Sequence, residues 1–142
     1  MSMPTAPDGL AHHSVTLGLA VDDAARAIDF YTRAFDAREI YRAPGRPGKI
    51  AHAQVRIGDT LLFLADEVLE DKESYRAPKT LGGTSCAVYL YLADADATFA
   101  QAVAAGATVL RPMTDEPWGD RVGLVRDPYG HLWALSTREV RP

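Results

Sequence analysis

Residues 22–36 read DDAARAIDFYTRAFD, and this stretch predicts an amphipathic helix. Either aspartate at its beginning can cap a helix, because an aspartate carboxylate accepts hydrogen bonds from the first free amides. The helix is expected from Asp23 to about Asp36, since the apolar residues between them recur at helical spacing. These apolar residues are Ala24, Ala25, Ala27, Ile28, Tyr31, Ala34 and Phe35. The run of residues 15–21 just before the helix is apolar with β-branched members, which predicts a strand.

Three further segments after the helix are typical of strands. Residues 39–42 are expected to form a short strand, followed by a loop rich in proline and glycine at 44–48. Residues 50–57 alternate between apolar and polar side chains, and Gly58-Asp59 can turn the chain into a hairpin partner at 60–65. The first half therefore predicts the order strand, helix, strand, strand, strand.

The same order starts again after a charged segment that contains Pro78, Gly82 and Gly83. A second helix is expected, capped by Asp94 or Asp96 and ended by a glycine at Gly106. The strands expected around it are residues 85–92, 107–113, 120–126 and 132–137, the last two joined by the turn-forming Asp127-Pro128-Tyr129-Gly130.

Landmarks of the two halves match at a nearly constant offset, which indicates an internal duplication. The matched pairs are Asp22 with Ala93, Asp36 with Gly106 and Gly58 with Gly130, at offsets of 71, 70 and 72 residues. One half alone would bury little surface, so the halves are expected to share one domain. The expected organisation is a tail at residues 1–13, a first module at 14–66, a linker at 67–83 and a second module at 84–138.

The composition narrows the classes of function. The formal net charge is −4 and the basic residues are dispersed, which argues against a nucleic-acid partner. A single cysteine, Cys86, rules out an intramolecular disulfide and suits a reducing compartment; its apolar neighbours predict a small buried side chain. No run approaches the roughly 20 apolar residues of a membrane span. We therefore expect a cytoplasmic protein without a membrane or nucleic-acid partner.

A βαβββ unit that occurs twice resembles the vicinal oxygen chelate superfamily, which contains glyoxalase I, bleomycin-resistance proteins and extradiol dioxygenases. The resemblance runs from about Val15 to Thr137, and its most specific features are residues 27–31 (AIDFY) and 127–130 (DPYG). Residues 78–83 (PKTLGG) and 118–121 (WGDR) resemble the glyoxalase-like branch of the phosphonate-operon type. The resemblance implies an α+β fold in which two tandem βαβββ modules form a ligand cup from curved mixed sheets. It also implies a homodimer.

Metal-using relatives take four ligands from the first and last strand of each module. Aligned on the helix landmarks, these positions fall at Thr16, Phe63, Ala87 and Ala134. Alanine and phenylalanine supply no donor for zinc, nickel or iron(II), and a shift of one residue would turn the neighbours to the opposite face. We therefore expect neither a metal nor another cofactor.

Strand alternation predicts which other side chains line the cup. Val55 and Ile57 are expected to face the helices, which places Arg56 with His52 and Gln54 on the cup side. The ligand-binding residues expected by strand parity, by position in the family or by their place in a loop are Thr16, His52, Gln54, Phe63, Tyr89, Tyr91, Trp118 and Arg121. Each has a plainer alternative: the tyrosines favour strands in any case, and Trp118 with Arg121 can form a structural corner. His12 and His13 are interpreted as part of a tail.

Three functions follow from this cup. The first is metal-free binding of a small aromatic or amphipathic molecule. The second is a metal-independent enzyme in which His52 transfers protons, as imidazole titrates near neutrality. The third is a metal-dependent glyoxalase or dioxygenase with displaced ligands.

Overall fold

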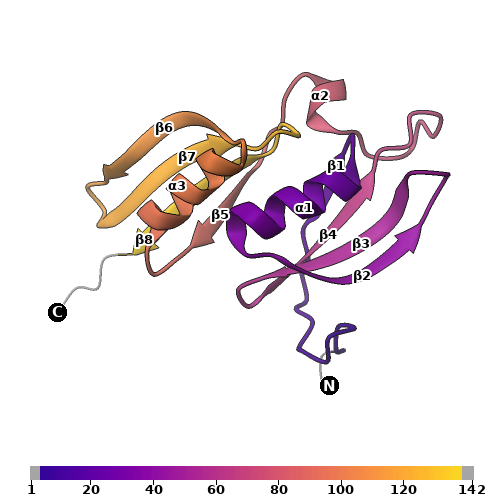
Figure 1. Ribbon diagram of the computed structural model, residues 1–142, viewed down its shortest axis with the longest axis horizontal. Helices are drawn as coiled ribbons and strands as arrows, with labels where there is room; N and C mark the ends of the chain where they lie inside the picture. Colours follow the sequence, from indigo (N-terminus) through magenta and orange to yellow (C-terminus); the bar gives the residue numbers. More distant parts are fainter. Residues whose placement is uncertain (1–3, 139–142) are drawn as a thin grey trace. The chain divides into compact units, whose positions relative to one another are not determined.

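The computed structural model describes residues 4–138 and divides the chain into two compact units. The first contains the residues up to Thr32 together with Asp36–Ala77, and the second contains Arg33–Phe35 together with the residues from Pro78 onward. Each unit holds one four-stranded sheet and one long helix (Figure 1). The duplicated βαβββ order and the α+β class expected from the sequence are therefore confirmed.

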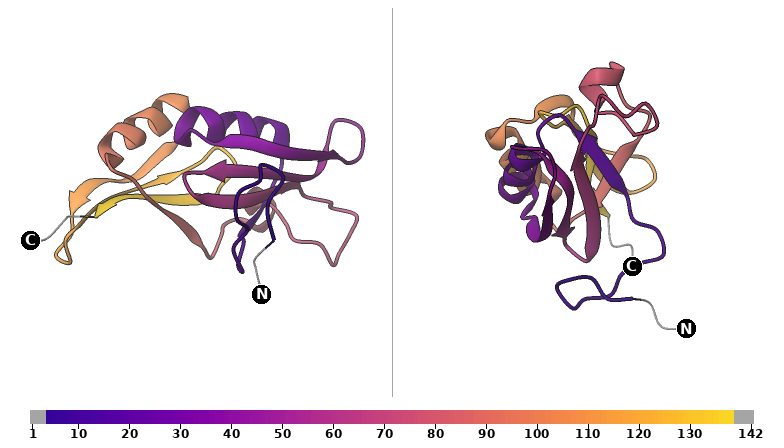
Figure 2. Two further views of the ribbon diagram at one scale, coloured as in Figure 1. Left: turned by 90° about the horizontal axis from the view of Figure 1, so that it is seen from below. Right: turned by 90° about the vertical axis from the view of Figure 1, so that its right-hand side faces the viewer.

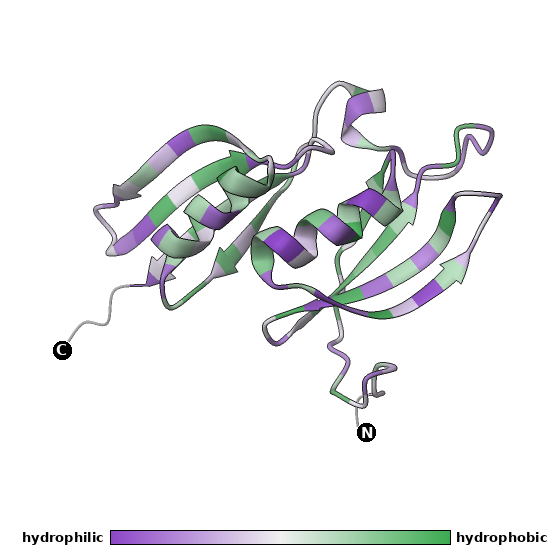
Figure 3. Ribbon diagram, in the orientation of Figure 1, coloured by the Kyte–Doolittle hydropathy of each residue, from purple (hydrophilic) through white to green (hydrophobic). Residues whose placement is uncertain are grey.

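The first module consists of five elements. They are β1 (Gly18–Val21), α1 (Ala24–Phe35), β2 (Arg38–Pro44), β3 (Ile50–Ile57) and β4 (Thr60–Asp66). The sheet has the order β1-β4-β3-β2, with β1 parallel to β4 and the other pairs antiparallel. Strand β4 is hydrophobic along most of its length (Figure 3), because it lies in the interior of the sheet.

Helix α1 begins and ends where the sequence predicts. The carboxylate of Asp23 accepts a hydrogen bond from the Arg26 amide at 3.2 Å, and Asp36 adopts a left-handed conformation with φ of 55°. Such a residue closes a helix because it turns the chain away from the helical path. The helix covers one face of its sheet (Figure 2), and its buried side chains include Ala24, Ala27, Ile28, Phe30 and Tyr31.

The second module repeats this arrangement. Its elements are β5 (Ala87–Tyr91), α3 (Ala95–Ala105), β6 (Thr108–Asp115), β7 (Asp120–Arg126) and β8 (Leu132–Arg138), in the sheet order β5-β8-β7-β6. Asp94 caps α3 by accepting the Ala97 amide at 3.1 Å, and Gly106 ends it with φ of 126°. Of the two aspartates considered, Asp94 is therefore the cap.

Several segments differ from the sequence prediction, among them strand β6, which runs to Asp115 instead of residue 113. Strand β1 begins at Gly18 instead of Val15, because ladder pairing with β4 starts at Phe63 and Val15 is 86% exposed. The expected linker includes a four-residue helix, α2 (Pro78–Leu81). Cys86 is exposed instead of buried, since it precedes β5 and its neighbour Ala87 is exposed as well.

Among the described residues, no helix is long and apolar enough to cross a membrane.

Candidate functional site

The first sheet has one face that its helix does not cover, and strand register defines which side chains lie on it. Phe63 in β4 pairs with Gly18 in β1 and with Gln54 in β3, and Gln54 in turn pairs with Tyr41 in β2. Residues directly opposite one another in a sheet point to the same face. The neighbouring residue Val55 is fully buried on the helix side, as expected. We call the surface of Gly18, Tyr41, His52, Gln54 and Phe63 the open face of the first sheet.

An aromatic and polar cluster occupies the centre of this open face. The His52 and Phe63 rings meet edge to face with their centroids 4.7 Å apart, and the Tyr41 ring lies 6.2 Å from His52. The Nε2 atoms of Gln54 and His52 lie 3.0 Å apart, within hydrogen-bond distance. The buried Oε1 atom of Gln54 accepts no hydrogen bond from residues 4–138. The sequence-predicted residues His52, Gln54 and Phe63 are thus brought together.

Gly18 leaves room beside this cluster. A Cβ atom built at Gly18 would meet only the Cβ of Phe63, at 3.9 Å, which is ordinary van der Waals contact. The glycine is exposed, and Thr16, two residues earlier, is half-buried in the chain that leads into β1. The open face therefore has an unfilled position next to the Phe63 ring.

The segment of residues 4–13 contributes to the open face a side chain that the sequence analysis does not predict there. His12 lies edge-on to Phe63 with a centroid distance of 5.9 Å. Asp8 of the same segment forms an ion pair with Arg56, at 2.6 Å between Arg56 Nε and Asp8 Oδ2. This hydrogen-bonded pairing with Arg56 lowers the pKa of Asp8 to about 2 and raises the pKa of Arg56. No local pattern signals a contact between residues 48 positions apart.

The open face of the second sheet carries aromatic and aliphatic side chains instead. Tyr89 pairs with Ala134, and Tyr91 pairs with Ser136. Tyr89 is 62% and Tyr91 51% exposed, and the Arg138 guanidinium lies 5.2 Å from the centre of the Tyr91 ring. Ser136 is fully buried, and its hydroxyl finds no hydrogen-bond partner among the described residues. Both tyrosines lie on this open face, opposite the side of the sheet that packs against α3.

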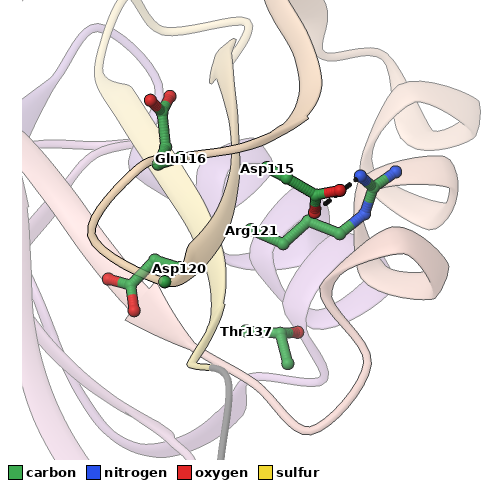
Figure 4. A pocket seen from close by; sticks show the side chains of 6 residues that line it. Asp115, Glu116, Asp120, Arg121 and Thr137 are labelled. Carbon is green, nitrogen blue, oxygen red and sulfur yellow. Dashed lines mark hydrogen bonds and ion pairs between the residues drawn. The ribbon is translucent and has the colours of Figure 1, made fainter.

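Arg121 lies on the other side of the second sheet, away from the tyrosines. Its guanidinium contacts the Asp96 carboxylate in α3 at 2.8 and 3.0 Å and that of Asp115 at 3.2 Å. These hydrogen bonds raise the pKa of Arg121 and lower that of Asp96. Arg121 borders a pocket of about 420 Å³ with Asp115, Glu116, Gly119, Asp120 and Thr137 (Figure 4). Trp118, in the loop between β6 and β7, is 65% exposed.

The residues at the family's metal-ligand positions do not fit a divalent ion. Phe63 and Ala134 lie on the open faces of the two sheets and present only hydrocarbon. Ala87 is exposed hydrocarbon as well, and Thr16 offers a single hydroxyl. Within residues 4–138, no group of three or more His, Cys, Asp or Glu side chains is arranged to hold a metal. The chemistry of these side chains gives no basis for a Lewis-acid step at the family's ligand positions.

Two βαβββ modules, each with a sheet that its helix covers on one side, define a glyoxalase-like protein. The chain belongs to the Glyoxalase/Bleomycin resistance protein/Dioxygenase superfamily, whose family model matches residues 10–135. The superfamily predicted from the sequence is thereby confirmed.

Relatives of known sequence and known structure agree with this assignment. An uncharacterized protein of Mycobacterium tuberculosis H37Rv is 48% identical over 125 residues, which cover 86% of this chain and 74% of the relative. The crystal structure of TioX from Micromonospora sp. ML1 is 32% identical with a TM-score of 0.67, and the match covers 92% of this chain and 99% of TioX. A PhnB protein from Bacillus cereus is 20% identical and shares the fold, with a TM-score of 0.67. The match covers 88% of this chain and 99% of the PhnB protein.

Proposed function

We propose that this protein binds a small planar aromatic molecule on the open face of its first sheet and needs no metal to do so. The single observation that carries the proposal is the cluster at the first sheet, where the half-buried Phe63 ring, the His52 ring and the Gln54 amide converge beside the unfilled position at Gly18. Small-molecule sites typically combine apolar and aromatic walls with a few convergent polar groups.

The chemistry of the cluster indicates what kind of molecule fits. Aromatic rings prefer edge-to-face or offset contacts with centroids about 4.5–7 Å apart, and the rings of His52 and Phe63 can offer such contacts to a third ring. Gln54 adds an amide whose oxygen has no partner among the described residues. A buried polar atom without a partner is costly, so a ligand that carries a hydroxyl or N–H group gains by supplying one. The proposed ligand is therefore aromatic with at least one hydrogen-bond donor.

The open face of the second sheet, taken by itself, carries side chains suited to the same class of ligand. Tyr89 and Tyr91 are both more than half exposed, although large aromatic side chains usually bury most of their surface. Tyrosine combines a rigid apolar ring with a hydroxyl group, which suits the recognition of flat molecules that carry polar groups.

We test the proposal with 1-naphthol as the probe, using isothermal titration calorimetry. Gly18→Val places a branched side chain beside Phe63 and should weaken binding at least tenfold. Ala51→Val is the matched control: it adds a branched side chain at an exposed position of the neighbouring strand β3, which strand alternation places on the opposite face from His52. If Gly18→Val binds 1-naphthol as tightly as the wild type, the open face of the first sheet is not the site.

A second candidate function is metal-independent acid–base catalysis by His52. The observation that favours it is the Gln54–His52 contact at 3.0 Å, because a hydrogen bond to one ring nitrogen fixes which nitrogen carries the proton. His52→Gln keeps a polar side chain of similar reach but cannot exchange protons near neutral pH. Loss of turnover with retained binding in this variant would establish catalysis, whereas full turnover of a substrate would eliminate His52 as the catalyst.

We further propose a cytoplasmic homodimer, in line with the family resemblance and the single cysteine. Light scattering coupled to size-exclusion chromatography tests the assembly directly: a mass of twice 15.4 kDa is expected, and a mass of 15.4 kDa would contradict it.

A further inference from the structure

Residues 4–13 form a small hairpin of their own. Thr5 and Ala11 form an isolated antiparallel bridge, and the His12 amide donates to the Pro4 carbonyl at 2.9 Å. Inside this hairpin the Ala6 amide donates to the Leu10 carbonyl at 2.8 Å, and Ala6 is only 5% exposed. The segment that the sequence predicts as a tail is thus an ordered loop.

One carboxylate ties this hairpin to the first sheet. Asp8 receives two hydrogen bonds from the Arg56 guanidinium, at 2.6 and 3.0 Å, and lies 3.4 Å from Arg38 Nη2. Arg38 and Arg56 are directly paired across β2 and β3, so their like charges need an anion between them. Arg56 is only 4% exposed, and a buried guanidinium is strongly destabilising without a partner. Asp8 supplies that partner and fixes the hairpin in place.

The ion pair between Asp8 and Arg56 also determines where His12, four residues after Asp8, is held. His12 ends the hairpin and places its ring edge-on to Phe63, the ring that His52 contacts as well. We propose that residues 4–13 form a wall of the ligand site: His12 is a ligand-binding residue, and Asp8 is the positioning residue that holds it beside Phe63 through Arg56. This inference rests on the proposed function, because it assumes that the ligand binds against Phe63.

The tether itself is tested without any ligand, by hydrogen–deuterium exchange of the full chain. The amides of Ala6, Gly9 and His12 donate hydrogen bonds within the hairpin and should be protected. Asp8→Asn removes the charge and should accelerate their exchange by at least tenfold, and Asp8→Glu should restore most of the protection. Unchanged exchange in Asp8→Asn would overturn the positioning role, whether or not 1-naphthol binds.

The wall is tested by a double-mutant cycle for binding of 1-naphthol. His12→Ala leaves the ion pair intact and should weaken binding about fivefold, which is the size expected for one lost aromatic contact. His13→Ala, at the exposed neighbouring position, is the matched control and should bind like the wild type. Asp8→Asn should weaken binding by a similar factor, and the double variant should be no weaker than either single variant, because both changes remove the same contact.

The outcomes separate the inference from the proposed function. If Gly18→Val abolishes binding while His12→Ala and Asp8→Asn leave it unchanged, the ligand binds on the open face of the first sheet. Residues 4–13 are then not a wall of its site. Additive losses in the double variant would show that Asp8 does not act through His12 and would also overturn the proposal. If binding is unaffected by Gly18→Val, the proposed function fails, and the exchange data alone decide whether Asp8 positions the hairpin.

Discussion

The carboxylate of Asp66 accepts a hydrogen bond from the backbone amide of Ala24 at 2.8 Å, which ties the end of β4 to the first turn of α1. The second module repeats the contact with a different side chain, since the Thr137 hydroxyl accepts the Ala95 amide at 2.8 Å. Both contacts join residues 42 positions apart, and they coincide when the chain is shifted by 71 residues. The duplication therefore extends from the order of elements to individual hydrogen bonds.

Asp66 also accepts the Ile50 amide at 2.7 Å, so removing it leaves two buried donors without a partner. Asp66→Ala should lower the free energy of unfolding by about 2–4 kcal/mol. Thr137→Val leaves one backbone amide without its acceptor and should lower the free energy of unfolding by about 1–2 kcal/mol. Urea denaturation measures both. Asp59→Ala, at an exposed turn, is the control and should stay within about 0.5 kcal/mol of the wild type. Equal losses for Asp66→Ala and Asp59→Ala would contradict the account.

The turn at Asp127 has a structural role. Its Oδ2 atom accepts the Trp133 indole N–H at 2.9 Å, and Oδ1 accepts the amides of Tyr129 and His131 at 2.9 and 3.0 Å. Because Asp127 is 2% exposed, Asp127→Ala should destabilise the fold by about 3 kcal/mol or more. A drop in the urea midpoint together with altered Trp133 fluorescence is the expected result. A stable Asp127→Ala variant with native fluorescence would contradict this structural role.

Two strand glycines distinguish the covered face from the open face. A Cβ at Gly123 in β7 would lie 2.5 Å from the sulfur of Met113 and 2.7 Å from the Phe99 ring, whereas one at Gly18 meets nothing closer than 3.9 Å. Gly123→Ala should therefore cost about 1–3 kcal/mol by overpacking. Gly18→Ala should leave thermal stability unchanged. If the order of the two effects is reversed in thermal denaturation, the assignment of faces is wrong.

The ion pair of Asp8 predicts a titration at unusually low pH. The hydrogen bonds from Arg56 lower the pKa of Asp8 to about 2, with Arg38 adding positive charge on the same face and Asp59 facing Arg56. A lowered pKa means that the stabilisation is complete above the ordinary value of 3.8 and is lost as pH falls through about 2. The Leu10 amide donates to Asp8 Oδ1, so its nitrogen chemical shift reports protonation.

In the wild type the Leu10 signal should titrate with a midpoint near 2. In Arg56→Gln the midpoint should move up towards 3.8, because the main cause of the shift is gone. A midpoint at or above 3.8 in the folded wild-type protein would show that the Asp8–Arg56 contact does not persist in solution.

Much of the fold is predictable from local pattern, and the errors have physical causes. Strand β3 has the predicted bounds, because its alternation of side chains reflects one covered and one open face. Helix α1 also has the predicted bounds, because Asp23 and Asp36 cap its two ends through local contacts. Strand β1 is shorter than predicted, because apolar character alone cannot show where pairing with β4 begins.

The site was predictable only where strand parity governs it. Alternation placed His52 and Gln54 on one face, and alignment with the ligand positions of the family placed Phe63 with them. The surroundings of Arg121 could not be predicted in this way, because its ion pairs with Asp96 and Asp115 depend on how α3 packs on the sheet. The Asp8–Arg56 contact could not be predicted from the sequence either, because a tertiary ion pair leaves no periodic signal there.

The most direct test of the account is the affinity of 1-naphthol for protein stripped of metal by a chelator, with its metal content verified by elemental mass spectrometry. The stripped protein should bind 1-naphthol as tightly as protein supplied with zinc, nickel or iron(II), because Thr16, Phe63, Ala87 and Ala134 offer no ligand set. Binding that disappears on stripping and returns with one stoichiometric metal would contradict it, and would bring the metal-dependent lyase and dioxygenase functions back into consideration.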